Sequence, residues 1–351
     1  MFSTYKPNDV KILLKDITGL VEPLGTKERE EKIQAGIHYS EMLPLEYEPT
    51  HKYMEIYNLA LERFSNITAD AVGVVAQQIW NDKGRDTVLI SLARAGTPIG
   101  ILIKHYMDKK YKCNIPHYTI SVIRGKGIDC NAMNYILSRH KPDKLQFVDG
   151  WTGKGAIRNV LSKALINYPQ VSGDLAVLSD PAYSAEKSGT HEDFLIASSC
   201  LNSTVSGLIS RTFLRNDIIG ENDFHGSAFY SELLDKDVTY EFINRIEQEF
   251  DTEKDYSLKY NKELTYLGLT ESENIRKIFN IKSINFVKPG IGETTRVLLR
   301  RVPWKILVHS LNDENNLGHI YQLAKEKNVP IEEYPLIHYK SCGLIKNLSD
   351  I

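Results

Sequence analysis

The stretch that decides the fold reads Leu145-Gln146-Phe147-Val148-Asp149-Gly150-Trp151-Thr152-Gly153-Lys154-Gly155-Ala156-Ile157. It begins with an apolar run typical of a buried strand and continues through an acid and a glycine-rich turn into a helical pattern. Such a turn presents backbone N–H groups and the positive end of a helix dipole to an anion. The spacing is neither that of a P-loop nor that of the Gly-x-Gly-x-x-Gly dinucleotide motif. The stretch therefore predicts an anion-binding turn, with an ordinary strand-to-helix turn as the alternative.

A second candidate anion site comes earlier in the chain, after the apolar strand pattern of residues 87–90. This strand leads into Arg94-Ala95-Gly96-Thr97-Pro98, in which Thr97 is a candidate helix N-cap and Pro98 suits the first helical position. A guanidinium group and free amides at the start of a helix can bind a diphosphate. We therefore assign this role to Arg94 and to the amides of Ala95, Gly96 and Thr97.

Two further segments carry polar residues after strand patterns. The strand pattern of residues 117–123 leads into Arg124-Gly125-Lys126-Gly127-Ile128-Asp129, where cations alternate with glycines and predict a mobile basic loop. An exposed hairpin tip with solubilising charges is the alternative. The strand pattern of residues 174–179 ends at Asp180. Because ligands of open α/β sheets bind at the carboxyl ends of the strands, Asp180 is a candidate contact to an acceptor base or a metal. Its alternative is a turn-forming Asp-Pro.

Composition places the chain among soluble globular proteins. Its 351 residues suggest two domains, or one large domain with an appendage. The four cysteines form no C-x-x-C pair, which fits a reducing cytoplasm and supports neither a zinc site nor a disulfide framework. There is no apolar signal core at the N-terminus and no apolar run of membrane-spanning length. We therefore expect a cytoplasmic protein without a membrane partner.

The C-terminal part differs in charge from the rest. A charged helical region over residues 235–274 precedes it and indicates a domain boundary. Residues 275–351 carry 12 Lys and Arg against 7 Asp and Glu, so their net charge is +5, whereas the whole chain has a net charge of −2. A glycine-containing loop, residues 287–296, leads into a helix within this part. These features indicate contact with RNA or a nucleotide, for which a solvated surface is the alternative.

The first two stretches resemble known phosphate-binding loops. The strand, acid, turn and helix around Asp149 resemble the phosphoribosyl-pyrophosphate (PRPP) loop of type I phosphoribosyltransferases. There the acid holds ribose hydroxyls and the turn, with its hydroxyl, holds the 5′-phosphate. The Leu-x-Arg-Ala-Gly sequence around Arg94 resembles the pyrophosphate loop of uracil-type phosphoribosyltransferases. The basic loop stands where these enzymes have a flexible flap that closes over PRPP and excludes water.

The motifs together resemble one family in particular, the phosphoribosyltransferase-like proteins of bacterial tellurite-resistance and stress operons, which carry a C-terminal pelota-type domain. The resemblance implies an α/β fold in which a type I phosphoribosyltransferase-like parallel sheet is flanked by helices, plus a small α/β pelota-like domain. It implies a phosphoribosyltransferase-like domain over residues 1–265, with its core at about residues 50–235, and an RNA-binding domain over residues 275–351. Whether the protein forms a homodimer stays open.

The implied activity is phosphoribosyl transfer from PRPP to a nucleobase-like acceptor, with Mg²⁺ bound through the diphosphate, which makes a nucleotide-like stress metabolite. The residues assigned to catalysis are Asp149, Arg94, Arg124 and Lys126. Those assigned to substrate binding are Ala95, Gly96, Thr97, Gly150, Thr152, Gly153, Lys154, Gly155 and Asp180. Those assigned to RNA contact are Lys288, Thr294, Arg296, Arg300 and Arg301.

Two alternatives stay open. The same family carries the label cysteine protease StiP, which requires a thiol–imidazole pair such as Cys200 with His191 or His225. However, Cys200 lies in a hydroxyl-rich segment, residues 198–211, where Asn202 is a candidate helix cap, and buried cysteines usually pack as small apolar residues. A PRPP- or nucleotide-sensing RNA-binding regulator without catalysis is the other alternative. The usual PRPP loop has two adjacent acids, whereas this chain has only Asp149, and this departure leaves the exact substrate open.

Overall fold

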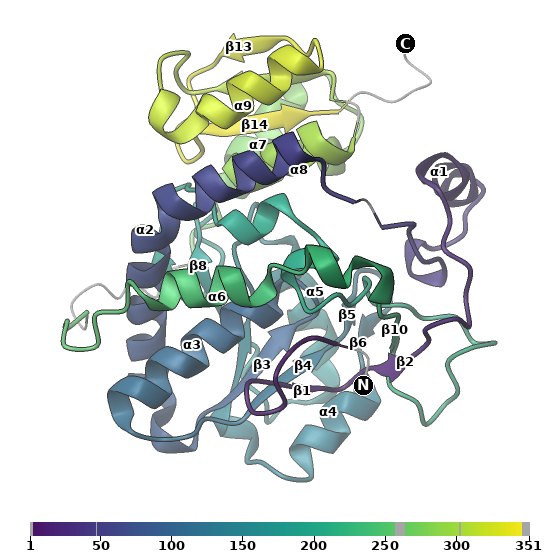
Figure 1. Ribbon diagram of the computed structural model, residues 1–351, viewed down its shortest axis with the longest axis vertical. Helices are drawn as coiled ribbons and strands as arrows, with labels where there is room; N and C mark the ends of the chain where they lie inside the picture. The colour runs from purple at the N-terminus through teal and green to yellow at the C-terminus, as the bar shows by residue number, and fades with distance from the viewer. Residues whose placement is uncertain (1–2, 47, 257–263, 302, 346–351) are drawn as a thin grey trace.

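The main sheet is parallel, and helices cover both of its faces. The computed structural model describes residues 3–46, 48–256, 264–301 and 303–345. Within these residues the main sheet has six strands, all parallel, in the order β1-β4-β3-β7-β8-β9 (Figure 1). In that order they span Lys11–Ile12, His117–Ile120, Val88–Leu92, Leu145–Val148, Leu175–Ser179 and Lys187–Thr190. This arrangement confirms the predicted parallel α/β sheet.

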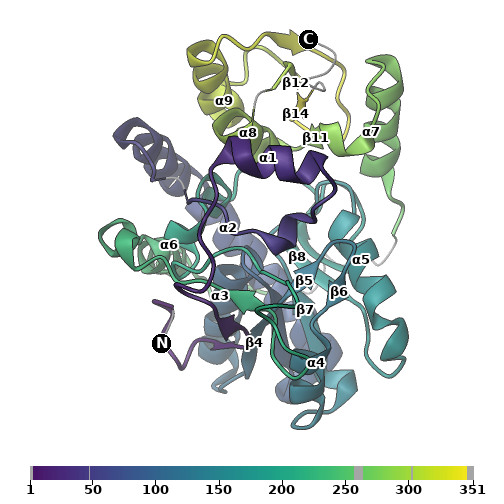
Figure 2. The same cartoon turned by 90° about the vertical axis from the view of Figure 1, so that its right-hand side faces the viewer.

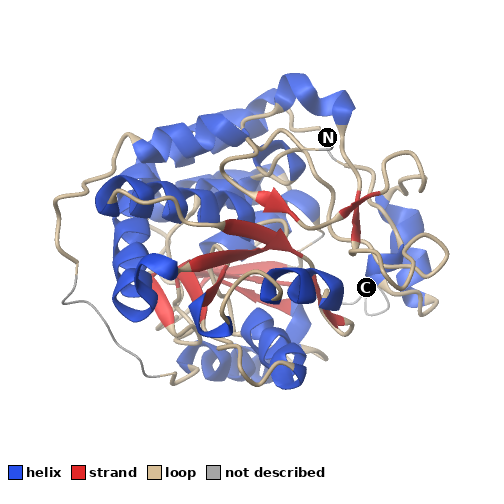
Figure 3. Ribbon diagram, turned by 90° about the horizontal axis from the view of Figure 1, so that it is seen from below, coloured by secondary structure: helices blue, strands red, loops and turns tan. Residues whose placement is uncertain are grey.

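Helices cover both faces of the sheet, as Figure 3 shows. One face packs against α2 (His51–Lys83) and α3 (Gly96–Tyr111), which α6 (Thr239–Glu247) joins. The other face packs against α4 (Cys130–Leu137) and α5 (Ala156–Ala164). Successive side chains of β3 serve the two cores in turn, since Leu89 belongs to the first and Ile90 to the second. A strand that is buried on both faces must be apolar throughout, which explains the continuous apolar run seen in the sequence.

The strand order changes direction between β3 and β7. After β3 the chain crosses through α3 to β4 on one side, whereas β7 pairs with β3 on the other side. The loops that follow β3 and β7 therefore leave the sheet side by side at its carboxyl edge. In open α/β sheets this is the position where ligands bind.

The C-terminal part forms a small α/β domain, seen at the top of Figure 1. Its sheet has the order β11-β14-β12-β13, and only β12 and β13 pair in parallel. Its strands are β11 (Val287–Pro289), β12 (Lys305–Val308), β13 (Ile331–Glu333) and β14 (Ser341–Leu344). Its helices are α7 (Leu267–Ile278), α8 (Ile291–Arg300) and α9 (Glu314–Glu326). The predicted small second α/β domain is confirmed.

The C-terminal domain is packed firmly onto the main domain. Ile291 and Leu298 of α8 belong to the same apolar core as Ile56 and Val75 of α2. The main-domain segment beneath α8 is the 3₁₀ helix Ala197–Cys200. The α-helix expected after Asn202 is wrong, because only a second 3₁₀ turn, Ser203–Val205, follows. Hydroxyls of this segment bond to its own backbone, as Ser206 Oγ does to the carbonyl of Asn202 at 2.6 Å, and such bonds compete with helix formation.

Smaller elements surround the carboxyl edge of the sheet. The predicted basic loop is an antiparallel hairpin of β5 (Val122–Ile123) and β6 (Gly127–Ile128). A short parallel pair, β2 (Lys15–Asp16) and β10 (Gly226–Ser227), lies beside it. Figure 2, seen from the side on which α1 (Thr26–Gln34) stands apart in Figure 1, shows this helix in front of the molecule at about the level of α8. In the part of the chain described, no helix is long and apolar enough to span a membrane.

Candidate functional site

The loops after β3 and β7 touch each other at Gly96. A Cβ atom added to Gly96 would lie 2.6 Å from the carbonyl oxygen of Val148 and 3.2 Å from Cα of Asp149. Real Cβ atoms do not approach backbone atoms so closely, so only glycine fits at the start of α3. The close approach places the Arg94 loop directly beside Asp149, as expected for the two ends of one ligand site.

Asp149 is a half-buried acid at the end of β7. Its Oδ1 accepts a hydrogen bond from the N–H of Gly150 at 2.8 Å. Burial raises the pKa of Asp149 to about 6, although the Gly150 N–H and the Arg296 guanidinium lower it. A carboxylate with a pKa near 6 is charged at neutral pH and can accept hydrogen bonds from sugar hydroxyls.

The turn after Asp149 offers backbone donors. In the described part of the chain, the N–H groups of Gly153, Lys154 and Gly155 donate to no protein acceptor. Gly155 has φ +75° and forms the N-cap of α5, so these amides stand at the start of a helix. The Lys154 side chain points elsewhere, because its Nζ donates to the carbonyls of Ile284 and Val287, each at 2.5 Å. Burial and the nearby Lys288 lower the pKa of Lys154 to about 8.

Thr152 and Asp180 lie inside the protein, which corrects their assignment to substrate contact. Thr152 is 2% exposed, and its hydroxyl donates to Oδ1 of Asp180 at 2.7 Å. Asp180 is fully buried and also accepts from the N–H groups of Ser184 and Ala185. The side chains of Thr152 and Asp180 bond to each other and to backbone groups, so they hold two loops together and position the turn.

Arg94 keeps donors free at the site. Its Nη1 donates to the carbonyl of Ile209 at 2.8 Å and approaches Glu46 Oε2 at 3.4 Å. Within the described residues its Nε and Nη2 donate no hydrogen bond. Thr97 does not cap α3, because its buried hydroxyl bonds to Thr119 at 2.6 Å and its N–H donates to the carbonyl of Arg94. Its assignment to diphosphate binding is therefore corrected, and Ala95 is the N-cap.

Arg211 is the site residue that sequence reasoning missed. It follows the two 3₁₀ turns, is half-buried, and stacks over the Tyr39 ring at 4.3 Å from the ring centroid. Burial, and after it the guanidinium group of Arg29, lower the pKa of Arg211 to about 10, with further lowering by Arg94 and Arg296 and an opposing effect of the Tyr39 phenol. Three arginines from separate segments, Arg29, Arg94 and Arg296, thus lie near Arg211. No local motif marks Arg211, because the chain around it has no regular periodicity.

The basic hairpin closes against the segment that precedes α2. The N–H of Arg124 donates to the hydroxyl of Tyr39 at 2.9 Å, and Lys126 lies 3.4 Å from Glu41. The Arg124 guanidinium reaches the C-terminal domain, where Nη1 donates to Oδ1 of Asn285 at 3.2 Å. In this state the side chains of Arg124 and Lys126 contact protein groups at the edge of the site.

The C-terminal domain contributes Arg296 to the site. Its guanidinium carbon lies 5.7 Å from the Trp151 ring centroid, and its Nη1 pairs with Glu293 at 3.2 Å. Lys288 is half-buried beside them, and burial lowers its pKa. Arg301 is exposed, whereas the side chain of Arg300 lies outside what the structure describes.

Thr294 is fully buried, and its hydroxyl donates to the carbonyl of Lys288 at 3.4 Å. A hydroxyl without access to solvent cannot contact RNA, so its assignment is corrected to a structural one. The start of α8, which the sequence linked to RNA, faces the main domain.

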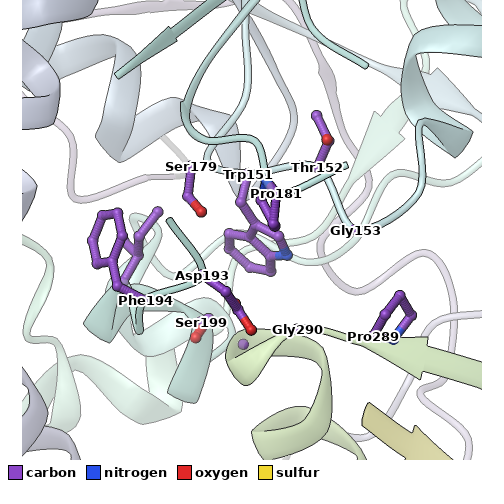
Figure 4. A pocket seen from close by; sticks show the side chains of 12 residues that line it. Trp151, Thr152, Gly153, Ser179, Pro181, Asp193, Phe194, Ser199, Pro289 and Gly290 are labelled. Atoms are coloured by element: carbon purple, nitrogen blue, oxygen red, sulfur yellow. The ribbon is translucent and has the colours of Figure 1, made fainter. Parts of the chain in front are cut away.

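Asp193 links the main domain to the C-terminal domain by hydrogen bonds. Its carboxylate accepts from the N–H of Ile291 at 2.9 Å, at the start of α8, and from the N–H of Lys340 at 2.8 Å. A carboxylate at a helix N-terminus is favourable to the helix dipole. Figure 4 shows Asp193 beside Trp151 and Gly290, around a cavity of about 10 Å³. That space holds about one water molecule.

Asp193→Asn should change how stability depends on pH. Burial raises the pKa of Asp193 to about 6, above the value of about 4 in an unfolded chain. The stabilisation from this group is therefore present in full below about pH 4 and is lost as the pH rises through about 6. Relative to the parent, Asp193→Asn should gain about 2 kcal/mol in unfolding free energy between pH 4.5 and 7.5. Denaturant titrations of both proteins measure this, and a constant difference over that range would contradict it.

The thiol and imidazoles of the protease alternative lie in separate environments. Cys200 is fully buried and belongs to the large apolar core. His191 stacks on Tyr183, and its Nδ1 contacts the carbonyl of Asp180 at 2.7 Å. His225 Nδ1 contacts Ser121 Oγ at 2.8 Å. Among the described residues, no group of three or more His, Cys, Asp or Glu side chains could hold a metal ion.

Comparison with known proteins shows the family. Residues 3–247 match the family described as tellurite-like stress resistance cysteine protease StiP. The chain belongs to the StiP family. Residues 266–347 match the PELOTA RNA binding domain. A relative from Acinetobacter baylyi, named cysteine protease StiP, is 35% identical over 371 aligned residues that cover 98% of this chain and 94% of the relative.

Solved structures resemble parts of this StiP-family chain weakly. A hypoxanthine-guanine phosphoribosyltransferase from Bacillus anthracis is 17% identical, with a TM-score of 0.27, over 37% of this chain and 76% of that one. A xanthine-guanine-hypoxanthine phosphoribosyltransferase from Helicobacter pylori is 18% identical, with a TM-score of 0.24, over 32% of this chain and 70% of that one.

Proposed function

We propose that this StiP-family chain transfers the phosphoribosyl group of PRPP to a nucleobase-like acceptor. The observation that carries the proposal is the contact of two anion-binding loops where the strand order changes direction, with Gly96 against Asp149. One loop offers arginine and helix-start donors, and the other offers an acid and three free amides. PRPP carries a diphosphate, a diol and a phosphate in the corresponding order.

Each group then has a defined task. Asp149 accepts hydrogen bonds from the ribose hydroxyls, and the amides of Gly153, Lys154 and Gly155 bind the 5′-phosphate at the start of α5. Arg94 and the amides of Ala95 and Gly96 bind the diphosphate. In the reaction the bond from ribose C1 to the diphosphate oxygen breaks and a bond from C1 to an acceptor nitrogen forms. Diphosphate leaves with the electron pair of the broken bond, and a proton carried by the acceptor nitrogen passes to solvent.

Positioned donors stabilise the leaving diphosphate as its negative charge develops. Mg²⁺, bound through the diphosphate oxygens, supplies further charge neutralisation. Arg124 and Lys126 on the hairpin lie at the mouth of the site, against Tyr39 and Glu41. A closed hairpin excludes water from the ribosyl centre, which water would otherwise hydrolyse.

The experiment is a pyrophosphate-release assay with PRPP, Mg²⁺ and a panel of heterocyclic acceptors. The parent should release pyrophosphate with at least one acceptor, and Asp149→Asn should release much less. Asp217→Asn is the matched control, since this exposed acid pairs with Arg215. Release that is equal in parent and Asp149→Asn would overturn the proposal. Tight PRPP binding without turnover on any acceptor would instead favour a PRPP-sensing RNA-binding regulator.

A cysteine protease is the second candidate function, because the family and the Acinetobacter relative carry that description. A catalytic thiol must reach its substrate and form a thiolate, and complete burial in an apolar core opposes both. We therefore expect Cys200→Ser to leave PRPP binding within about threefold of the parent, since it changes one buried atom remote from the anion donors. Peptide cleavage by the parent that Cys200→Ser abolishes and Asp149→Asn does not would favour the protease.

A further inference from the structure

Arg211 is a cation that the proposed reaction leaves without a task. In the described part of the chain its guanidinium group donates no hydrogen bond and has no carboxylate within ion-pair distance; its contact is the Tyr39 ring. Arg215, four residues later, also lies over an aromatic ring, that of Phe213, but it pairs with Asp217 at 2.6 Å. The two arginines share a stacked arrangement and differ in whether a carboxylate balances the charge.

The surroundings of Arg211 are positively charged. Arg29, Arg94 and Arg296 lie near enough to disfavour its charged form. Of these, Arg94 approaches Glu46 at 3.4 Å and Arg296 pairs with Glu293 at 3.2 Å. A half-buried guanidinium group among like charges is unfavourable unless an anion joins it. Groups kept in unfavourable surroundings of this kind are concentrated at ligand sites.

The two anionic parts of PRPP already have donors. The diphosphate has Arg94 and the amides that start α3, and the 5′-phosphate has the amides that start α5. Arg211 lies against Tyr39, whose hydroxyl accepts from the Arg124 N–H of the hairpin at 2.9 Å. Arg211 and the hairpin thus share Tyr39 as a contact. In the proposed reaction the hairpin closes over the ribosyl group, which is where the acceptor must arrive.

We propose that the acceptor is an aromatic heterocycle that carries its own negative charge, and that Arg211, held against Tyr39, binds its carboxylate or phosphate. This inference rests on the proposed function and names the acceptor class. The planar guanidinium presents a fork of N–H donors that matches the two oxygens of a carboxylate or phosphate. The Tyr39 ring fixes the plane of that fork and leaves its edge free for the anion.

The test compares matched pairs of acceptors that differ in charge. Orotate with uracil and nicotinate with nicotinamide probe a carboxylate, and pyridoxine 5′-phosphate with pyridoxine, whose ring nitrogen is free, probes a phosphate. Binding is measured by calorimetry with the full-length chain in the presence of PRPP and Mg²⁺. At least one charged probe should bind about tenfold more tightly than its neutral partner, which corresponds to one charge-assisted interaction of about 1.4 kcal/mol. Equal binding within every pair by the parent would overturn the inference without any variant.

Variants test whether Arg211 is the residue that binds the anion of the acceptor. Arg211→Gln should reduce the difference within the discriminating pair to about twofold and leave the affinity for PRPP within about threefold, since only the acceptor's anion loses its partner. Arg211→Lys should restore part of the difference, and the matched control Arg215→Gln should leave it unchanged. Equal losses for PRPP and the charged probe would place Arg211 in the PRPP site and overturn the inference. A parent that binds no PRPP would refute the proposed function, whereas PRPP binding without discrimination refutes only this inference.

Discussion

Arg94→Ala should weaken PRPP binding by roughly 10- to 150-fold and ribose 5-phosphate binding by only about threefold, because a hydrogen bond to a charged group contributes roughly 1.5–3 kcal/mol. Two effects act in the same direction. The variant loses the free Nε and Nη2 donors at the start of α3. It also leaves Glu46, whose side chain is 3% exposed, without the guanidinium group it approaches at 3.4 Å.

A second variant separates these effects. Arg94→Ala combined with Glu46→Gln removes the unpaired carboxylate and should recover part of the PRPP affinity, while ribose 5-phosphate binding stays unchanged. Calorimetric titrations of both ligands measure this, with thermal melting to confirm that each variant folds. Equal losses for PRPP and ribose 5-phosphate would show that Arg94 does not bind the diphosphate.

Asp149→Asn should weaken PRPP binding by roughly 10- to 150-fold, because a hydrogen bond to a charged acceptor contributes roughly 1.5–3 kcal/mol. The asparagine keeps the size of the side chain and one oxygen acceptor, so the neighbouring Gly96 contact should survive. Ribose 5-phosphate should lose a similar factor, since the lost interaction involves the ribose hydroxyls that both ligands share. This pattern is the opposite of that expected for Arg94→Ala.

The same variant should also change the pH dependence of binding. The pKa of Asp149 is raised to about 6, so the carboxylate that accepts the ribose hydroxyls is protonated as the pH falls below that value. PRPP affinity of the parent should therefore decrease from pH 7.5 to pH 5, and that of Asp149→Asn should decrease less. The exposed-acid control Asp217→Asn should follow the parent. Parallel profiles for parent and Asp149→Asn would contradict the assignment.

Local sequence patterns were sufficient for the parts of the site that a single strand and turn determine. Asp149 and Arg94 each follow an apolar strand, and parallel strands align their carboxyl ends, so the proximity of the two loops follows from the fold class. The parallel sheet and the small second domain were predicted correctly for the same reason, because continuous apolar runs and helical periodicity are local signals.

The direction of side chains in the turn could not be predicted. Thr152 and Lys154 belong to the resemblance with a PRPP loop, yet one bonds to Asp180 inside the main domain and the other to carbonyls of the C-terminal domain. Both partners are far away in the sequence. The polar residues of the turn indicated that it would form hydrogen bonds. Which groups they bond to depends on tertiary packing.

The positions of Arg211 and Arg296 near the site could not be predicted from the sequence either. Arg211 follows a segment without regular secondary structure, so no periodicity assigns it to a face. Arg296 was expected to contact RNA because it lies in a basic domain, and the structure places it near Trp151. Its position depends on the docking of α8 through Asp193 and a shared apolar core, which no local pattern reports.

The most direct test of the central claim is a calorimetric titration of the full-length chain with PRPP, carried out with and without Mg²⁺. We predict binding of one PRPP per chain that is strengthened by Mg²⁺ and weakened in Arg94→Ala. Absence of PRPP binding at millimolar concentrations with Mg²⁺, by a chain that melts cooperatively, would contradict it.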